Sequence, residues 1–140
     1  MSNDIFSRLN PGISDLAPYE PGKPIDDVAK EYGISNIIKL ASNENPLGAS
    51  PIALRSIADL DNSLHLYPDG NCTELKNVIA HHEKVAEESV ILGNGSNEVL
   101  ELIARAWLNP SRNAITSRHA FAVYRIVTQA AGAKLIEVEA

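Results

Sequence analysis

Apolar residues recur along much of this chain at every third or fourth position, which is the spacing of one face of a helix. The first such segment runs from Pro24 to Tyr32, and a second follows the pair Ser50-Pro51. Three further segments have the same spacing: one behind Asn71, one across residues 96–110 and one from Ala120 to Ala131. We therefore expect a helix in each of these places.

The residues at the ends of these segments are typical helix boundaries. Pro51 suits the first turn of a helix after a Ser50 N-cap, and Gly33 and Gly132 follow the last apolar positions of two other helices. Asn71, followed three residues later by Glu74, resembles a capping box. The apolar face of the helix behind it is predicted to be buried, and comprises Leu75, Val78, Ile79 and His82. The same holds for the segment 96–110, where the face comprises Val99, Leu100, Ile103, Ala104 and Trp107.

Shorter apolar runs between the helices predict β-strands. These runs are NIIKLA at 36–41, SVILGN at 89–94, NAITS at 113–117 and AKLIEVEA at 133–140. After residue 70, short strands alternate with helices, which is the pattern of crossover units around a largely parallel sheet. The predicted fold class is therefore α/β.

Proline and glycine are frequent in the first third of the chain, in NPG, APYEPGKP and NENPLG, so an extended N-terminal arm is expected. We divide the chain into an arm with a short helix at 1–34, a strand and loop at 35–49, and the first part of a larger α/β domain at 50–140. Because a parallel sheet is covered by helices on both faces, we expect further helices and strands to follow Ala140.

Composition and charge narrow the classes of function. The chain has 140 residues, 44% of them hydrophobic, which fits a globular domain with a core. Its formal net charge is -6 and it has no cluster of Lys and Arg, which argues against nucleic acid or an anionic membrane surface as a partner. No apolar segment approaches the roughly 20 residues that cross a bilayer. A single cysteine, Cys72, and an N-terminus without a signal-peptide pattern favour a cytoplasmic setting.

The segment LGNGSNE at 92–98 is the strongest candidate for a binding site. It precedes a predicted helix, whose first amides lack intrahelical partners and favour an anion such as phosphate, and glycines let that anion approach closely. Glu98 occupies the third glycine position of Gly-x-Gly-x-x-Gly, and no Gly-Lys-Ser/Thr follows, so neither nucleotide motif matches. The local pattern favours equally a simple turn in which Ser96 or Asn94 caps the helix.

Three further segments carry side chains suited to a ligand. HAFAVY follows a predicted strand, at the edge where ligands of open parallel sheets bind, and Phe121 is placed to stack on a planar ring there. SNENPLG holds Asn43 and Glu44 on a constrained loop, and LYPDG offers the Tyr67 hydroxyl. Each has a structural alternative, with Phe121 as a core residue and the other two segments as ordinary turns.

No metal site and no cysteine nucleophile is expected. His81-His82 lacks a second set of ligands, and His82 lies on the apolar side of its helix, where a core histidine is the better interpretation. Cys72 has no nearby histidine or basic residue that would activate its thiol.

Five segments, taken in order, resemble the N-terminal part of the histidinol-phosphate aminotransferases, pyridoxal-phosphate enzymes of fold type I. They are APYEPGKP, IIKLASNENPLGASP, LYPDG, ILGNGSNEVLELIARAW and HAFAVY. The resemblance extends from about Leu16 to the end of the chain, and five motifs in one order are more specific than any single motif. It implies that this chain is an incomplete fold-type-I large domain preceded by an extended arm.

The resemblance also implies a cofactor and the residues that bind it. Gly95, Ser96 and Asn97 would hold the phosphate of pyridoxal 5'-phosphate, and Phe121 would stack on the pyridine ring. Tyr67, in the YP motif, would reach the cofactor phosphate of a neighbouring subunit. The resemblance therefore implies a homodimer with shared active sites.

The implied reaction is the transfer of an amino group between histidinol phosphate and 2-oxoglutarate, which yields glutamate and imidazole acetol phosphate in histidine biosynthesis. On the substrate side, the resemblance places Tyr19, Asn43 and Glu44. The family's Schiff-base lysine, pyridine-binding aspartate and substrate-binding arginine lie in later sequence that this chain does not contain. None of the six lysines stands in the lysine motif of the family; they are Lys23, Lys30, Lys39, Lys76, Lys84 and Lys134. We therefore expect no catalytic residue in residues 1–140 and no activity from this chain alone.

Two other interpretations stay open from the sequence. Aromatic-amino-acid aminotransferases and cobalamin-pathway decarboxylases of the same fold share much of this N-terminal pattern. A non-catalytic phosphate-binding α/β domain, complete at 140 residues, would need a closed core without a further helix.

Overall fold

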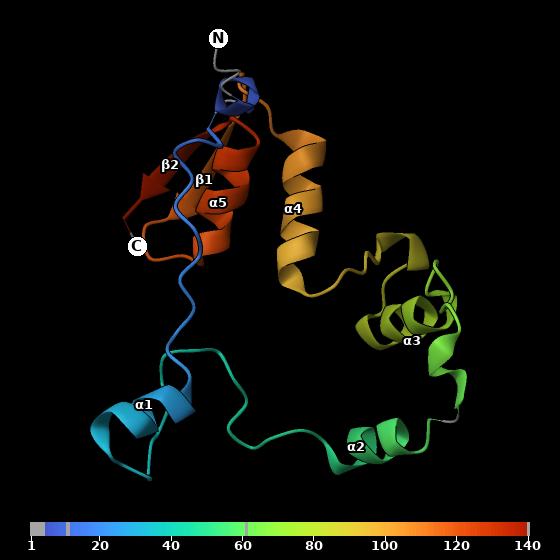
Figure 1. Cartoon of the computed structure of the whole chain (residues 1–140). Coiled ribbons are helices and arrows are strands. Elements are labelled where there is room, and N and C mark those ends of the chain that lie inside the picture. The colour runs from blue at the N-terminus through green and yellow to red at the C-terminus, as the bar shows by residue number, and fades with distance from the viewer. Residues whose placement is uncertain (1–4, 11, 61, 140) are drawn as a thin grey trace. The chain divides into compact units, whose positions relative to one another are not determined.

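The fold is taken from a computed structural model that describes residues 5–10, 12–60 and 62–139 (Figure 1). The chain forms two compact units. The sheet unit comprises Met1–Tyr19 and Cys72–Ala140, and the helical unit comprises Glu20–Asn71.

The helical unit contains two α-helices, α1 (Ile25–Tyr32) and α2 (Pro51–Ala58), and a 3-10 helix at Asn62–His65. Both α-helices lie where the apolar spacing predicts them. The predicted stop is confirmed, because α1 ends at Gly33, whose φ of 65° is left-handed. Ser50 and Pro51 occupy the predicted N-cap and first helical position of α2, although the Ser50 side chain makes no capping hydrogen bond.

The strand predicted at 36–41 is wrong. This segment has no regular secondary structure, and it pairs with no described strand. Ile38 and Leu40 are 81% and 89% exposed, so the apolar residues that suggested a strand lie in solvent. A β-strand requires hydrogen bonds from a neighbour, and the described part of the chain supplies none at this segment.

The sheet unit carries the remaining elements. It begins with a 3-10 helix at Ile5–Arg8. From residue 73 the elements follow in the order α3 (Thr73–Glu83), a 3-10 helix (Glu87–Ser89), α4 (Ser96–Trp107), β1 (Asn113–Ser117), α5 (Ala122–Ala130) and β2 (Lys134–Val138).

The sheet is parallel, as predicted. β1 pairs with β2 in a register that sets Asn113 opposite Lys134 and Ser117 opposite Val138. The connecting helix α5 crosses from the end of β1 to the start of β2 and packs on both strands (Figure 1). Such a crossover unit defines the α/β class, so the predicted fold class is confirmed.

The core of the sheet unit is small and lies around α4 and α5, which pack against each other. Ala104 of α4 and Val123 of α5 are buried. Thr128 of α5 is buried as well, and its hydroxyl donates a hydrogen bond to the Tyr124 carbonyl at 2.7 Å. This bond satisfies a hydroxyl that would otherwise be costly to bury.

The start of α3 differs from the prediction. The helix begins at Thr73 after Cys72, which has a left-handed φ of 50°, and no capping box forms. Instead, the Asn71 amide donates to the Asp69 carboxylate at 2.9 Å, which makes a tight turn before the helix.

The predicted buried face of α3 is mostly wrong. Leu75 and Val78 are exposed, and so is His82, whereas Ile79 is half-buried. Ala80 is the residue of α3 that the structure buries. Helical spacing identifies an apolar face, but burial depends on a partner element, and the described chain provides only the short Glu87–Ser89 turn against α3.

The strand predicted at 89–94 is also wrong. Its first residue ends a 3-10 helix, Val90 is extended, and residues 90–92 are unpaired in the described chain. The helix that follows is confirmed, although on its predicted face only Ala104 is buried. Val99 and Leu100 are half-buried, while Ile103 and Trp107 are exposed.

No helix in the described residues has the length and apolar character that crossing a membrane requires.

Candidate functional site

The candidate site is built at the start of α4. Gly95 is the N-cap residue, and Ser96 and Asn97 form the first turn. No side chain caps this helix, and in the described chain neither the Ser96 hydroxyl nor the Asn97 side chain has a hydrogen-bond partner. The interpretation of this segment as a mere cap by Ser96 or Asn94 is therefore wrong.

The two glycines of this loop are required for different reasons. Gly95 has φ 81° and ψ 175°, a backbone conformation that is essentially restricted to glycine. Gly93 instead makes a close approach, because a Cβ atom there would lie 2.9 Å from Glu98 Oε2 and 3.0 Å from Val99 Cγ2. Gly95 is thus required by its backbone conformation, whereas Gly93 leaves room for the Glu98 carboxylate and for Val99.

Glu98 fixes the loop from the first turn of α4. Its carboxylate accepts a hydrogen bond from the Asn94 amide at 2.5 Å, and the Gly95 amide donates to the Gly93 carbonyl at 2.8 Å. These two bonds use the amides before the helix. The first amides inside the helix lack intrahelical partners by the geometry of any α-helix.

The start of α4 therefore presents what an anion needs. Ser96 and Asn97 contribute backbone amides, a hydroxyl and a side-chain amide, all exposed, at the positive end of a helix of 12 residues. The Glu98 carboxylate weakens the positive potential locally, but it is turned onto the Asn94 amide and holds the loop.

An aromatic pair lies in the same unit. Phe121 is the N-cap residue of α5, directly after the turn that follows β1, so it stands at the carboxyl end of the strand as predicted. The Tyr19 ring contacts it edge to face, with ring centroids 6.1 Å apart and an interplanar angle of 79°. Tyr124 makes a similar contact on Phe121 at 6.3 Å and 87°. Phe121 is still 42% exposed, so it is not an ordinary core residue.

A pocket of about 430 Å³ joins the two parts of the site. The arm lines it from Leu16 to Tyr19, α4 contributes Asn97 and Glu101, and α5 contributes Val123 and Ile126. The structure thus brings together two predicted site residues, Tyr19 and Asn97, that are far apart in sequence. Among the residues that the structure describes, no lysine or arginine lines this pocket.

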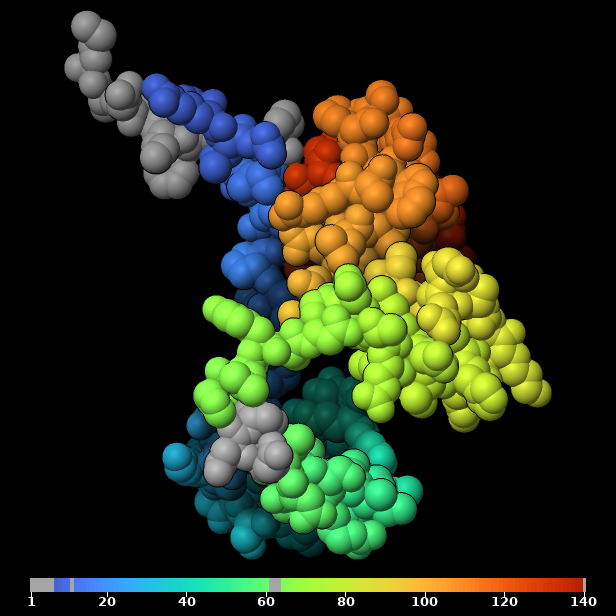
Figure 2. All heavy atoms as spheres, turned by 90° about the vertical axis from the view of Figure 1, so that its right-hand side faces the viewer, coloured from blue at the N-terminus to red at the C-terminus, as the bar shows by residue number. Residues whose placement is uncertain are grey.

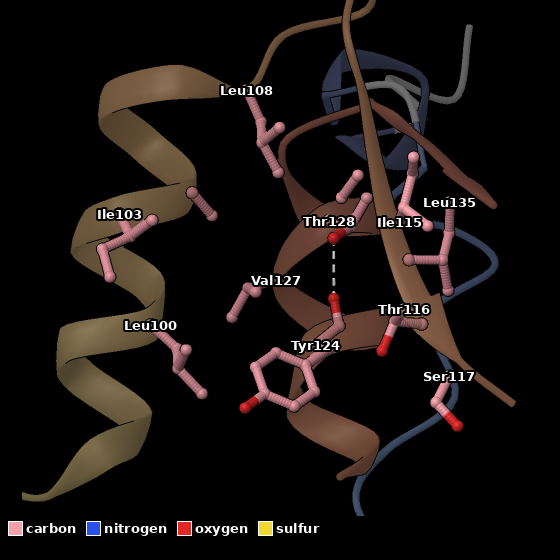
Figure 3. Close-up of a pocket in the computed structure, with 12 residues that line it drawn as sticks. Leu100, Ile103, Leu108, Ile115, Thr116, Ser117, Tyr124, Val127, Thr128 and Leu135 are labelled. Atoms are coloured by element: carbon pink, nitrogen blue, oxygen red, sulfur yellow. Dashed lines mark hydrogen bonds between the residues drawn. The ribbon is translucent and has the colours of Figure 1, made fainter. Parts of the chain in front are cut away.

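A second groove, of about 500 Å³, lies between α4, α5 and β1 and is mostly apolar (Figure 3). Leu100 and Ile103 of α4 line one side, and Val127 of α5 and Ile115 of β1 line the other. It contains none of the predicted site residues. This groove is therefore not part of the candidate site.

The other predicted residues belong to the helical unit. Tyr67 is 101% exposed, with no covering side chain. Glu44 accepts a hydrogen bond from Lys39 at 2.7 Å. The side chain of its neighbour Asn45 accepts a hydrogen bond from the Leu47 amide and donates one to the Gly48 carbonyl. Asn43 is exposed on the same loop. The loop is thus shaped by its own hydrogen bonds.

The hydrogen bonds of two residues, Glu98 and Gln129, were not predicted from the sequence. Glu98 was noted only as a mismatch to a glycine motif, although an acidic residue in the first turn of a helix is a common partner for loop amides. Gln129 of α5 donates to the Gly12 carbonyl at 3.1 Å, and no local sequence signal marks that contact between residues 117 positions apart.

The chain belongs to a known family of enzymes. The family model for "Aminotransferase class I and II" matches residues 35–140, which include the loop at the start of α4 and Phe121. The chain is therefore a member of the class I and II aminotransferases.

Relatives within this family carry a more particular name. The chain is 55% identical over 136 residues to "Histidinol-phosphate aminotransferase 2" of Pseudomonas fluorescens, covering 96% of this chain and 37% of the relative. It is 54% identical over 134 residues to the protein of the same name from Pseudomonas aeruginosa, covering 94% and 36%. The chain thus spans a little over a third of the length of these relatives.

A solved structure agrees with the fold. The histidinol-phosphate aminotransferase from Sinorhizobium meliloti, solved in complex with pyridoxal-5'-phosphate, superposes with a TM-score of 0.78 at 22% identity. The match covers 97% of this chain and 36% of that one. The predicted α/β fold of this enzyme family is confirmed, for the part of the fold that the chain contains.

Proposed function

We propose that this chain forms one wall of a pyridoxal 5'-phosphate site, with the cofactor phosphate at the start of α4. The observation that carries the proposal is the uncapped first turn, where Ser96 and Asn97 follow the glycine-only backbone of Gly95. The donor set suits a dianionic phosphate, which helix N-termini bind through their free amides. The phosphate-binding residues are Gly95, Ser96 and Asn97.

Phe121 is proposed to orient the cofactor ring. It is partly exposed and stands after β1, at the sheet edge where ligands of open parallel sheets bind. Tyr19 contacts Phe121 and lines the pocket beside Asn97, which supports its assignment to the substrate side. An aromatic face provides apolar contact to a planar ring and excludes water from it.

Pyridoxal phosphate, when bound, supplies the electron sink that makes the α-hydrogen of an amino substrate acidic. The residues of this chain bind the cofactor phosphate, orient the cofactor ring and cover it from water. We propose that the group which moves the proton is contributed by sequence outside residues 1–140, so that these residues hold no catalytic residue and the chain alone is inactive.

For the protein that carries this chain, we propose amino-group transfer between histidinol phosphate and 2-oxoglutarate, with glutamate as co-product, in histidine biosynthesis. Two relatives above 50% identity bear the name of that enzyme. Glutamate and 2-oxoglutarate are the second substrate pair, and a cytoplasmic location fits the single free thiol of Cys72.

Tyr67 is proposed to reach the cofactor phosphate of a second copy, so that the working protein is a homodimer. Its ring is fully exposed, which leaves the hydroxyl available to a partner. Asn43 and Glu44 are proposed to line the substrate side. The Lys39 ion pair and the Asn45 bonds support this role, because they hold the loop in one shape without a ligand.

An assay of the protein that carries this chain tests the reaction. We expect turnover of histidinol phosphate with 2-oxoglutarate, and at least about 10-fold lower kcat/KM for phenylalanine, because a site that binds a substrate phosphate is left unsatisfied without one. A preference for phenylalanine would assign an aromatic-amino-acid aminotransferase instead. Release of carbon dioxide without amino transfer would assign a decarboxylase.

The assignment of the phosphate site has its own test. Ser96→Ala removes one donor and is expected to weaken cofactor binding about 10- to 100-fold, since a hydrogen bond to a charged group contributes roughly 1.5–3 kcal/mol. Ser89→Ala, in the 3-10 helix before the loop, is the matched control and should leave binding unchanged. Equal cofactor affinity in both variants would remove Ser96 from the site.

A further inference from the structure

The N-terminal arm is tied to the far end of α5 by one side chain. The Gln129 side-chain amide donates to the Gly12 carbonyl at 3.1 Å, and the bond is partly buried. Gln129 lies in the last turn of α5, two residues before the C-cap Ala131. Phe121 lies at the other end of the same helix, about 12 Å away along its axis.

Gly12 is shaped for this contact. Its φ of +89° is left-handed, and a Cβ atom there would lie 2.4 Å from the Gln129 carbonyl oxygen. That carbonyl already accepts a hydrogen bond from the Gly132 amide at 2.8 Å, so it cannot move away without opening the end of α5. The arm backbone and the end of α5 therefore approach as closely as a glycine permits.

From this tie the arm runs along the helices to the candidate site. The Ile13 amide donates to Asn10, and the Leu16 amide donates to Ile13, so two turns fix the direction of the chain. Residues Leu16–Tyr19 then line the pocket with α4 and α5, and Figure 2 shows this blue segment lying beside the orange surface of α4. The segment ends with Tyr19 against Phe121.

We infer that Gln129 is a positioning residue, which fixes the arm through Gly12 and so holds Tyr19 against Phe121. Gln129 is not among the described residues that line the pocket, so its effect on the site passes through the arm. The consequence for substrate binding rests on the proposed function, because it requires Tyr19 to face the substrate.

The tie itself is tested on this chain without any ligand. Gln129→Met keeps the length and apolar bulk of the side chain and removes the donor. We expect chymotrypsin to cleave after Leu16 and Tyr19 about 2- to 10-fold faster, as expected for loss of one partly buried hydrogen bond. The nuclear Overhauser effect between the Tyr19 and Phe121 rings should weaken in parallel.

Two further variants control this result. Arg125→Met changes the same helix, but Arg125 pairs with Glu137 of β2 rather than with the arm, so the cleavage rate should not change. Gly12→Ala should release the arm as Gln129→Met does, because its Cβ meets the Gln129 carbonyl. A circular-dichroism spectrum that matches the parent shows that each variant is folded. Unchanged cleavage and an unchanged ring contact in Gln129→Met would overturn the inference.

The coupling to substrate is tested in the protein that carries this chain. Gln129→Met and Tyr19→Ala should each raise KM for the amino donor with little change in kcat, and the double variant should resemble Tyr19→Ala alone. Additive effects on KM would show that Gln129 does not act through Tyr19. If the arm is released but neither variant alters KM, the tie stands and the substrate role proposed for Tyr19 fails.

Discussion

Helices α4 and α5 of the sheet unit and helices α1 and α2 of the helical unit differ in what covers their apolar faces. α4 and α5 pack on each other and bury Ala104, Val123 and Thr128. Neither α1 nor α2 buries a residue, although the apolar residues of both have helical spacing. The comparison shows that local signals place a helix, whereas burial is decided by neighbouring elements.

Strand formation depends on neighbouring elements even more than helix burial does. Residues 113–117 and 134–138 pair because a crossover helix sets them side by side. Residues 36–41 have an equally apolar sequence and remain unpaired in the described chain. The backbone hydrogen bonds of a helix form within the helix, whereas those of a strand require a neighbouring strand.

The largest expected effect comes from a charge placed in the core of the sheet unit. Val123→Asp should destabilise this unit by at least about 3 kcal/mol, because the carboxylate would be buried without a partner. Amide hydrogen exchange of β1 and β2 should then lose its protection. Ile57→Asp, at a position 64% exposed on α2, should leave that protection intact. Protection that survives Val123→Asp would contradict the burial of Val123 in the core of the sheet unit.

A second prediction compares two glycines with positive φ. Gly95→Asn should destabilise the native conformation of the loop by about 1–3 kcal/mol, because φ 81° and ψ 175° suit only glycine. Gly33→Asn should cost less than about 0.5 kcal/mol, because asparagine tolerates the left-handed conformation at φ 65° and ψ 30°. Amide chemical shifts of the first turn of α4, and of α1, would report each change. Equal tolerance at both positions would contradict the assigned conformation of Gly95.

A smaller effect is expected at Thr128. Thr128→Val removes the hydroxyl that donates to Tyr124 and should cost about 0.5–1.5 kcal/mol. Thr128→Ser keeps the hydroxyl and removes one methyl group, so it separates the hydrogen bond from packing. The free energy of unfolding of the sheet unit, measured by hydrogen exchange of the β1 amides, would rank the variants. A valine variant as stable as the parent would show that the bond contributes nothing.

The smallest effect is expected at the surface. Arg125→Met breaks the ion pair to Glu137, but the arginine side chain is 61% exposed, and such pairs contribute roughly 0–1 kcal/mol. The same exchange measurement should therefore differ from the parent by less than about 0.5 kcal/mol. A larger loss would mean that this exposed pair contributes more to holding α5 on β2 than surface ion pairs usually do.

The sequence was sufficient for features with a local cause. Gly33 ends α1, Pro51 begins α2 and Gly95 precedes α4, each because a backbone conformation or a missing amide requires that residue type. The parallel pair of strands followed from the alternation of strand and helix. The exposure of Leu75 could not be predicted, because spacing does not reveal whether a partner covers a face.

The candidate site was predictable in part for the same reason. The first turn of α4 and the place of Phe121 follow from local pattern and from the rule that ligands bind at the carboxyl ends of parallel strands. The resemblance placed Tyr19 on the substrate side, but nothing in the sequence indicated its contact with Phe121. The bond between Gln129 and Gly12 joins residues 117 positions apart, and nothing local indicates it.

The central claim is that the start of α4 binds the phosphate of a cofactor. The most direct test is titration of the isotopically labelled chain with inorganic phosphate and then with pyridoxal 5'-phosphate, followed through amide chemical shifts. The account predicts saturable shifts that are largest at Gly95, Ser96 and Asn97, absent at the start of α2, and lost in Gly95→Asn. Shifts that are largest elsewhere, or that persist unchanged in Gly95→Asn, would contradict it.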